Sequence, residues 1–253
     1  SREDPYPSVV LEAMAAELPV VMFAGATGSE DLARQGLALT VPAEDAAAMG
    51  RAAAALLADA EGRAAMVAKA ARHIAENTSF TDYAFDLLTR AGKPVPRISV
   101  IVPSYNYEKY IRERIESVAA QDMPILEIIV LDDCSTDRSP EIIAELAASS
   151  PAPIRFVPNE TNSGNVFRQW QKGLGLARGD YIWIAEADDL AAPDFLSTVM
   201  RGFEAPGVVL SYCESVQIDG DDNPLAPDYR YYTDPVAPGK WDANYVNSGK
   251  AEI

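Results

Sequence analysis

Three carboxylates, Glu186, Asp188 and Asp189, come directly after the apolar run "YIWIA" at residues 181–185. In an extended backbone the side chains of residues i and i+2 point to the same side, so Glu186 and Asp188 can converge on one ion. Hard oxygen ligands suit Mg²⁺ or Mn²⁺, which usually keep several waters and share a substrate's phosphates. A divalent cation would also relieve the repulsion among the three charges. The segment therefore predicts a metal site.

Polar residues also follow two earlier apolar runs. After "ISVIV" (98–102) come Pro103, Ser104, Tyr105 and Asn106, and after "EIIVL" (127–131) come Asp132 and Asp133. A turn and a helix cap would explain both groups structurally. One Asp suffices for a cap, however, so the second is free for another role. A carboxylate there can accept a hydrogen bond from N3 of a uracil ring.

A fourth run, "IRFV" (154–157), precedes the turn "NSG" at residues 162–164 and a helix. Arg168 and Lys172 are spaced i, i+4 on that helix. Solvated surface charges are the ordinary explanation of such a pair. In so acidic a region, a cation pair near the ligand edge of a sheet can instead meet a pyrophosphate. The sequence leaves both explanations open.

The elements that must position these residues follow from the hydrophobic pattern. Short apolar runs typical of buried strands lie at residues 98–102, 127–131, 154–157, 181–185 and 208–212, with Pro103 expected to end the first. The intervening segments have helical spacing, one with Tyr110, Ile111, Ile115, Val118 and Ala119 on a single face and the next with Val166, Phe167, Trp170, Leu174 and Ala177. Strand–helix alternation predicts an α/β fold with a mostly parallel sheet flanked by helices. Ligands bind at the carboxyl ends of such strands.

Composition excludes several classes of protein. The 253 residues carry a net charge of −17, which argues against binding to nucleic acid. No apolar run approaches the roughly 18 residues of a membrane span. The chain has 2 cysteines, far apart in the sequence, which favours a reducing, cytoplasmic setting.

The pattern changes once along the chain. Residues 1–92 are alanine-rich and helical in period, with a strand expected within 18–24 and a helix break near Gly62. The segment 93–97 contains two prolines and reads as a linker, so we expect domains at 1–92 and 98–253. Residues 219–253 lack a strong period and read as a loop.

Together "ISVIVPSYNYEKYIRERIESVAAQ", "EIIVLDDCSTD", "NSGN" and "ARGDYIWIAEADDLAAPDFL" resemble the inverting glycosyltransferases of family 2, which have the GT-A fold. The resemblance covers about residues 97–213. It implies transfer of a sugar from a nucleotide-diphosphate sugar, with UDP favoured, to a glycan or lipid-linked acceptor. Mg²⁺ or Mn²⁺ would assist, and polysaccharide synthesis at the cytoplasmic face of a membrane, with peripheral association, is the expected setting.

The same resemblance implies roles for single residues. The nucleotide site would comprise Pro103, Ser104, Tyr105, Asn106, Asp132, Asp133, Arg168 and Ala187, with Asp133 at the uracil. Glu186-Ala187-Asp188 would stand at the family's D-x-D position, with Asp188 as the direct metal ligand and Glu186 and Asp189 beside it. The general base that deprotonates the acceptor would lie beyond Ile253, so we expect this chain to bind a donor but to transfer sugar poorly.

The first zone resembles another family. "SREDPYPSVVLEAMAAELPVV" and "GATGSEDL" are similar to the C-terminal part of a family 4, GT-B glycosyltransferase over about residues 1–90. Asp4 and Glu12 would stand at that family's E-x7-E motif. Two alternatives to a sugar transferase are a non-catalytic nucleotide- or glycan-binding module and a nucleotidyltransferase. The second would require a glycine-rich loop after the first strand, where "PSYNYEKY" has no glycine.

Overall fold

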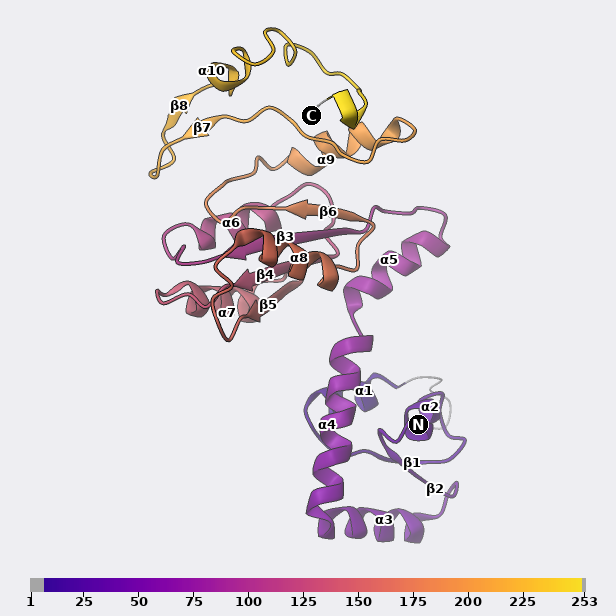
Figure 1. The fold of residues 1–253 in the computed structure, drawn as a ribbon. Helices are drawn as coiled ribbons and strands as arrows, with labels where there is room; N and C mark the ends of the chain where they lie inside the picture. The colour runs from indigo at the N-terminus through magenta and orange to yellow at the C-terminus, as the bar shows by residue number, and fades with distance from the viewer. Residues whose placement is uncertain (1–6, 252–253) are drawn as a thin grey trace. The chain divides into compact units, whose positions relative to one another are not determined.

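The computed structural model describes residues 7–251 and divides the chain into two compact units, residues 1–94 and 95–253 (Figure 1). Each unit has its own core. None of the helices in the described part has the length and hydropathy to cross a membrane.

The first unit is mostly helical. Its helices are α1 (Ser8–Ala15), α2 (Glu30–Arg34), α3 (Ala46–Ala58), α4 (Ala60–Asn77) and α5 (Phe80–Arg90). Two short parallel strands, β1 (Val21–Phe23) and β2 (Leu39–Val41), lie within it, the first inside the expected strand region. The helix break lies at Asp59, not at Gly62, because the Asp59 side chain caps α4 by accepting the Gly62 N–H at 2.9 Å.

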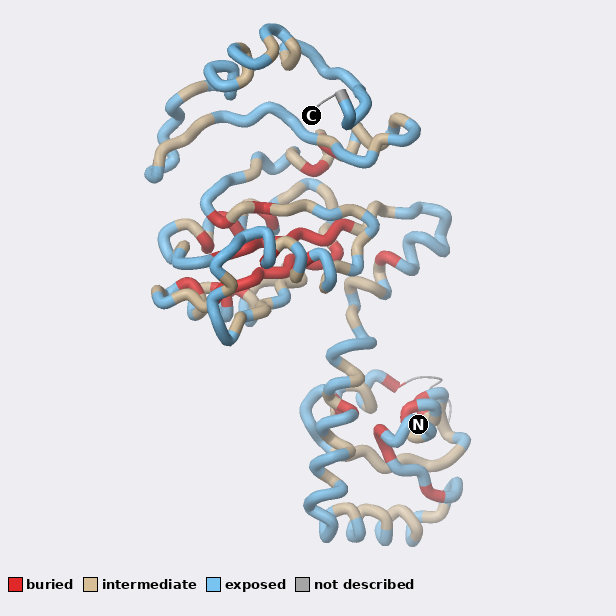
Figure 2. Tube along the Cα trace, in the orientation of Figure 1, coloured by how far each residue is buried: buried red, intermediate tan, exposed pale blue. Residues whose placement is uncertain are grey.

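The second unit contains the four-stranded parallel sheet, in the order β5-β4-β3-β6. Its strands are β3 (Ile98–Ser104), β4 (Glu127–Asp132), β5 (Ile154–Pro158) and β6 (Tyr181–Ile184). Ser104 pairs with Asp132 and Ile101 with Ile184, so β4 and β6 end on either side of the end of β3. Every residue of β3 and β4 is buried, as Figure 2 shows for the centre of this unit. The prediction of a mostly parallel α/β sheet flanked by helices is confirmed.

Helices cover both faces of this sheet. On one face α6 (Ile111–Ala119), α7 (Ser139–Ser149) and α9 (Phe195–Met200) surround the main apolar cluster. On the other, α8 (Val166–Leu176) packs on β3 and β4 over Ile101, Ile129 and Leu131. Continuous apolar strands form here because both faces of the sheet are covered.

The expected end of the first strand was wrong. β3 continues through Pro103, which pairs in register with Leu131 of β4. The Ile101 carbonyl accepts the Ala185 N–H at 2.8 Å, so the backbone polar groups of Ile101 point toward β6. The backbone of Pro103, two residues further on, points to the same side. Because the β3–β6 pairing has ended at Ile101, the missing N–H of Pro103 costs the sheet no hydrogen bond.

The expected strand at 208–212 does not form. Val209 is 91% exposed and Leu210 75% exposed, and no strand of the described chain pairs with them. Apolar, β-branched residues make a strand only where a neighbour satisfies their backbone groups and covers their side chains. The observed sheet therefore has four strands instead of five.

The expected inner face of α8 was also wrong. Val166, Phe167 and Leu174 are 41%, 61% and 50% exposed, while Gln169 and Gly173 are buried against the sheet. A Cβ added at Gly173 would lie 2.5 Å from Cγ2 of Ile101, so glycine sets the close approach of helix and sheet. Helical spacing identified the apolar stripe of α8. It did not show that the helix would pack on the sheet through the side that carries Gly173.

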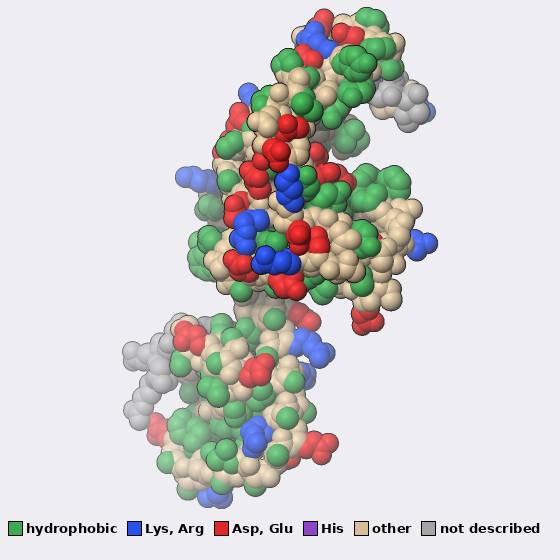
Figure 3. All heavy atoms as spheres, turned by 90° about the vertical axis from the view of Figure 1, so that its left-hand side faces the viewer, with side chains coloured by type: hydrophobic (Ala, Val, Ile, Leu, Met, Phe, Trp, Pro, Cys, Tyr) green, Lys and Arg blue, Asp and Glu red, His purple; other side chains and the backbone are tan. Residues whose placement is uncertain are grey.

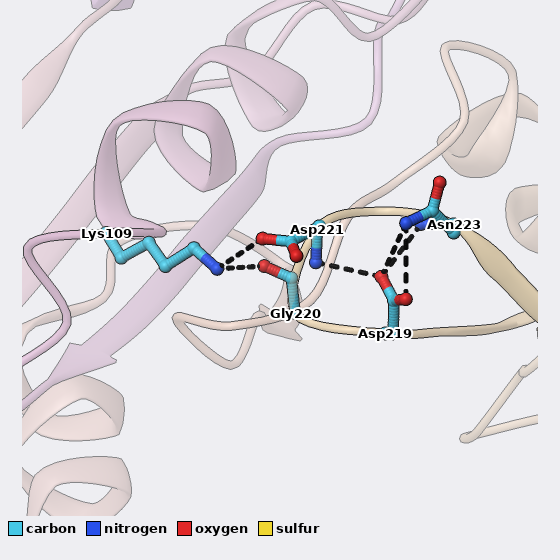
Figure 4. A network of polar contacts seen from close by, with 5 residues as sticks. All are labelled: Lys109, Asp219, Gly220, Asp221 and Asn223. Carbon is cyan, nitrogen blue, oxygen red and sulfur yellow. Dashed lines mark hydrogen bonds and ion pairs between the residues drawn. The ribbon is translucent and has the colours of Figure 1, made fainter.

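The segment 219–253, expected to be a loop, contains some regular structure. Its strand β8 (Pro224–Ala226) forms an antiparallel hairpin with β7 (Gln217–Ile218), which lies just before the segment, and α10 (Arg230–Thr233) follows. In the hairpin turn Asp219 accepts the N–H groups of Asp221 and Asn223 at 2.8 and 3.0 Å (Figure 4). Lys109 donates to Asp221 at 2.8 Å and to the Gly220 carbonyl, which joins the turn to the segment after β3 (Figure 4).

The segments after β3 and β4 are cross-linked by side chains. The Asp137 carboxylate accepts the N–H groups of Ser139 and Glu108, each at 2.9 Å, and Glu108 accepts the Arg138 N–H at 2.9 Å. Burial raises the pKa of Asp137, but the hydrogen bonds from Ser139 and Glu108 outweigh it and leave the pKa below its ordinary value of 3.8.

The contact between α8 and β3 can be tested with two glycines of one helix. We expect Gly173→Ala to destabilise the chain by about 1–3 kcal/mol, because the added methyl group overpacks the buried Ile101. Gly175→Ala is the matched control: nothing lies within 4 Å of its added Cβ, and alanine favours the helix by up to about 1 kcal/mol. Urea unfolding of both variants decides the matter. Equal effects would contradict the close approach at Gly173.

The Asp137 link predicts a pH-dependent loss of stability. Because the folded pKa is depressed, the stabilisation is present above pH 3.8 and is lost as the pH falls through the folded pKa. We expect Asp137→Asn to cost about 1 kcal/mol at pH 7 and less at pH 3, measured by urea unfolding. Asp194→Asn is the control, since Asp194 precedes α9 without capping it. A difference that is the same at both pH values would disprove the electrostatic role.

Candidate functional site

The segments that follow the four strands come together at the carboxyl edge of the sheet. Tyr107, after β3, donates its hydroxyl to Asp188, after β6, at 3.4 Å. Asn106, after β3, donates its N–H to the Ser135 hydroxyl, after β4, at 2.9 Å. The strands of the second unit end on the left of Figure 1, and Figure 3, which turns that side to the viewer, shows acidic and basic side chains gathered there.

Asp132, the last residue of β4, stabilises the turn that follows the strand. It is 2% exposed, and its carboxylate accepts the Ser135 N–H at 2.9 Å and the Ser135 hydroxyl at 2.5 Å. Between them Cys134 has a φ of 63°, a left-handed conformation that is costly for a residue with a Cβ. The two bonds to Asp132 hold this tight turn in place.

Asp133 is the most heavily bonded carboxylate of the edge. It is 4% exposed. Its Oδ1 accepts from the side-chain nitrogens of Asn159 and Gln169 at 2.6 and 2.8 Å and from the Ser163 N–H at 2.8 Å. Its Oδ2 accepts only the Ser163 hydroxyl, at 2.8 Å, which leaves one lone-pair direction for a donor group on a ligand. Asp133 thus ties β4 to the segment after β5 and to α8.

The last residues of β3 and those that follow it divide into buried and exposed ones. Pro103 and Ser104 are buried, and the Ser104 hydroxyl oxygen has no hydrogen-bond partner. Tyr105 is 46% exposed, so its ring is available to a ligand. Asn106 is exposed with a φ of 59°, and its Oδ1 accepts the Thr136 N–H at 2.8 Å. Asparagine tolerates the left-handed region better than most residues, which fits this position.

The two expected cations of α8 lie at its first turns. Arg168 is exposed, and its Nη1 donates to the Ser163 carbonyl at 3.1 Å. Lys172 donates to the Asn159 side chain. Both side chains therefore contact the segment that surrounds Asp133, although the role of Arg168 toward a phosphate remains a prediction.

The carboxylates after β6 differ in their surroundings. Asp188 and Asp189 are exposed, whereas Glu186 is half-buried and accepts the Trp170 ring N–H at 3.0 Å. Burial raises the pKa of Glu186, the Trp170 hydrogen bond lowers it, and the charges of Asp188 and Asp189 raise it, with a net rise. Ala187 is 1% exposed and packs in the main core, and its contact with a nucleotide remains a prediction.

A metal at this position would take few ligands from the protein. Within residues 7–251 no group of three or more His, Cys, Asp or Glu side chains converges as a metal site. Exposed Asp188 and Asp189 nevertheless offer hard oxygen atoms, which fit an ion that completes its shell with water and diphosphate oxygens. The donor set therefore fits Mg²⁺ or Mn²⁺ shared with a ligand, rather than a cage made by the protein.

Four residues of the edge were missed by the sequence reasoning: Tyr107, Gln169, Trp170 and Arg114. Tyr107 and Gln169 were not singled out, and Trp170 was placed on the apolar face of its helix. Arg114 was passed over because only the apolar residues of its helix were considered. Only Arg114 carried a usable signal, because it falls i+3 from Ile111 on the predicted inner face and is 3% exposed in the structure. Glu12, of the other motif, is exposed on α1, and Asp4 lies outside the described residues.

Comparison with protein families gives two matches. The model of glycosyl transferase family 2 matches residues 99–249, and that of glycosyl transferases group 1 matches residues 1–73. Both resemblances predicted from the sequence are confirmed.

Individual relatives are similar over parts of the chain. The succinoglycan biosynthesis protein ExoO of Rhizobium meliloti is 32% identical over 129 residues, 50% of this chain and 36% of ExoO. The poly(ribitol-phosphate) beta-N-acetylglucosaminyltransferase TarS of Staphylococcus aureus is 38% identical over 95 residues, 37% of this chain and 16% of TarS.

Two solved structures are similar at low TM-scores. The structure of S. aureus TarS 1–349 in complex with UDP-GlcNAc matches with a TM-score of 0.40 and 26% identity, covering 48% of this chain and 40% of that one. The mannosyltransferase PcManGT from Pyrobaculum calidifontis in complex with GDP-Man and Mn²⁺ matches with a TM-score of 0.42 and 27% identity, covering 51% and 41%.

The chain spans less than half of the length of each of these relatives. The family 2 match nevertheless includes the four-stranded sheet except for its first residue, Ile98, and every polar segment at the carboxyl edge of that sheet. It extends over more than half of the chain. The chain therefore belongs to glycosyl transferase family 2 and, with it, to the glycosyltransferase class of enzymes.

Proposed function

We propose that the carboxyl edge of the β5-β4-β3-β6 sheet binds a nucleotide-diphosphate sugar, and that the protein transfers the sugar with inversion to a glycan or lipid-linked acceptor. The observation that carries the proposal is the meeting of segments from all four strands. Tyr107 reaches Asp188 across the edge, and Asp133 holds the segment after β5 next to the turn after β4. A ligand at this edge can contact both acids from one side of the sheet.

Each part of a donor has candidate partners. For the base and ribose these are the exposed Tyr105 ring, the free lone pair of Asp133 and the backbone of Ala187. Asp188 and Asp189, held apart from the core, would meet the diphosphate through a shared divalent cation. Arg168 would lie near the phosphates or the base. A UDP sugar is favoured because Asp133 can accept a hydrogen bond from the uracil N3.

Mg²⁺ or Mn²⁺, when bound, would neutralise charge that develops on the departing diphosphate. The residues of the chain would then position and orient the donor. Tyr107 holds Asp188 on one side, and Trp170 fixes Glu186 on the other. Asp219 is bound within the hairpin turn and is assigned no part in deprotonating the acceptor.

The relatives support a setting for this activity. ExoO is named for succinoglycan biosynthesis and TarS for addition of N-acetylglucosamine to poly(ribitol phosphate). By analogy, we infer that this protein takes part in assembling a cell-surface polysaccharide. Action at the cytoplasmic face of a membrane follows only from the family resemblance and remains a prediction.

Calorimetric titration of the chain with UDP in Mn²⁺ tests donor binding. We expect measurable heat that disappears with excess EDTA. Asp188→Ala should weaken binding by at least about tenfold, since even residues that only orient metal ligands contribute 10–100-fold. Glu145→Ala, which removes an exposed carboxylate on α7, is the control and should bind as the original chain does.

Two outcomes would contradict different parts of this proposal. Heat that is unchanged in EDTA would remove the metal from it but leave the nucleotide site in place. Absence of any heat with UDP, dTDP and GDP in Mn²⁺ would overturn the donor site itself.

A further inference from the structure

Arg114 is a buried charge on the inner face of α6. It lies among Ile111, Ile115 and Val118 and is 3% exposed. Its Nε and Nη1 atoms have no hydrogen-bond partner. A buried cation without such partners is costly to the fold, so some other interaction must compensate for it.

One compensating contact is with the ring of Trp183 on β6. The guanidinium Cζ lies 5.2 Å from the centre of that ring, within the range of a cation–π interaction. This contact places Arg114 under β6, only a few residues before the acidic segment. A cation–π contact alone satisfies none of the guanidinium N–H groups. It therefore explains where the Arg114 side chain lies, but it does not fully compensate for the burial of its charge.

The second compensating influence is the acidic segment Glu186–Asp189. Burial lowers the pKa of Arg114 below its ordinary value, and the charges of Asp189, Glu186 and Asp188, in that order, offset part of this effect by raising it. The effect is reciprocal, because the charge of Arg114 lowers the pKa of Glu186. The guanidinium and the carboxylates therefore stabilise one another without a direct hydrogen bond.

Arg114 faces the core of the fold. It is buried with Ile111, Ile115 and Val118 of α6, and its guanidinium lies over the Trp183 ring. Its influence on the site must pass through the carboxylates, which makes it a positioning residue.

We propose that Arg114 is a built-in counter-cation of the Glu186–Asp189 segment, which holds the carboxylates in place without metal and limits how tightly they take up a divalent cation. The proposal rests on the metal-assisted function proposed above. It deepens that function by assigning the tuning of the ion's affinity to a residue that touches neither the ion nor the donor.

Opposite shifts separate this role from a packing role. Removing the Arg114 charge leaves the carboxylates to repel one another, so the metal-free chain loses stability. It also removes a positive charge that repels an incoming divalent cation, so the affinity for that cation rises. If Arg114 only filled space, its replacement would lower both the stability of the metal-free chain and the affinity for the divalent cation.

Arg114→Met tests this directly, because methionine keeps an unbranched apolar chain and loses the charge. Binding of Mn²⁺ alone, followed by electron paramagnetic resonance of the free ion, should be at least about threefold tighter than in the original chain, as expected for removal of a nearby like charge. Thermal unfolding in EDTA should occur at a lower temperature. Arg114→Lys, which keeps the charge, should retain the original Mn²⁺ affinity.

Arg112→Met is the matched control. Arg112 lies on the same helix with 41% side-chain exposure and pairs with Glu145 at 2.9 Å, so its loss changes the net charge equally but at a solvated site. It should change the Mn²⁺ affinity by much less than Arg114→Met. An equal change in both variants would mean that net charge, not Arg114, sets the affinity, and would overturn the proposal.

Unchanged or weaker Mn²⁺ binding by a folded Arg114→Met chain, including no detectable binding in either protein, would overturn the proposal. If Arg114→Met does not fold, Arg114→Met combined with Asp189→Asn decides. Folding of the double variant supports charge compensation, and its failure to fold means a packing role. UDP binding by the original chain separates these results from the proposed function, because it tests the donor site without reference to Arg114.

Discussion

The hydrogen bonds accepted by the buried Asp133 carboxylate hold the carboxyl edge of the sheet together. Three of its four donors come from the segment after β5 and one from Gln169 of α8. A carboxylate that is 4% exposed has little access to water, so such donors are needed to satisfy its oxygen atoms. Removal of Asp133 would leave buried N–H groups unpaired, so the position of the turn 159–165, and of Arg168 that contacts it, depends on this one side chain.

The sheet could be predicted from the sequence because a strand that is buried on both faces consists almost entirely of apolar residues. Strands β3 to β6 appear as continuous apolar runs, and each lies within a residue or two of its expected position. Residues 208–212 have the same texture, yet they form no strand. Their composition records a preference for burial but not whether a neighbouring strand is present, which is a property of the fold around them.

The sequence predicted which segments meet at the candidate site. It did not predict which individual side chains contact one another there. Parallel strands bring their carboxyl ends to one edge, so Asp133 and Asp188 could be expected near each other. The partners of Asp133 could not, because Gln169 faces the sheet only as a result of the glycine at position 173. The apolar stripe of α8 indicated the opposite face, since helical spacing carries no information on how closely two elements approach.

Buried polar atoms without hydrogen-bond partners show where this fold loses stability. In the described part of the second unit, the buried side-chain atoms without a hydrogen-bond partner belong to Ser104, Arg114 and Gln169. Ser104 ends β3, Gln169 binds Asp133, and Arg114 acts on the acids after β6. A fold selected only for stability would satisfy these groups or replace them with apolar ones. Ser104 and Gln169 lie at the carboxyl edge or bind a residue there, so part of this cost falls where the candidate site is built.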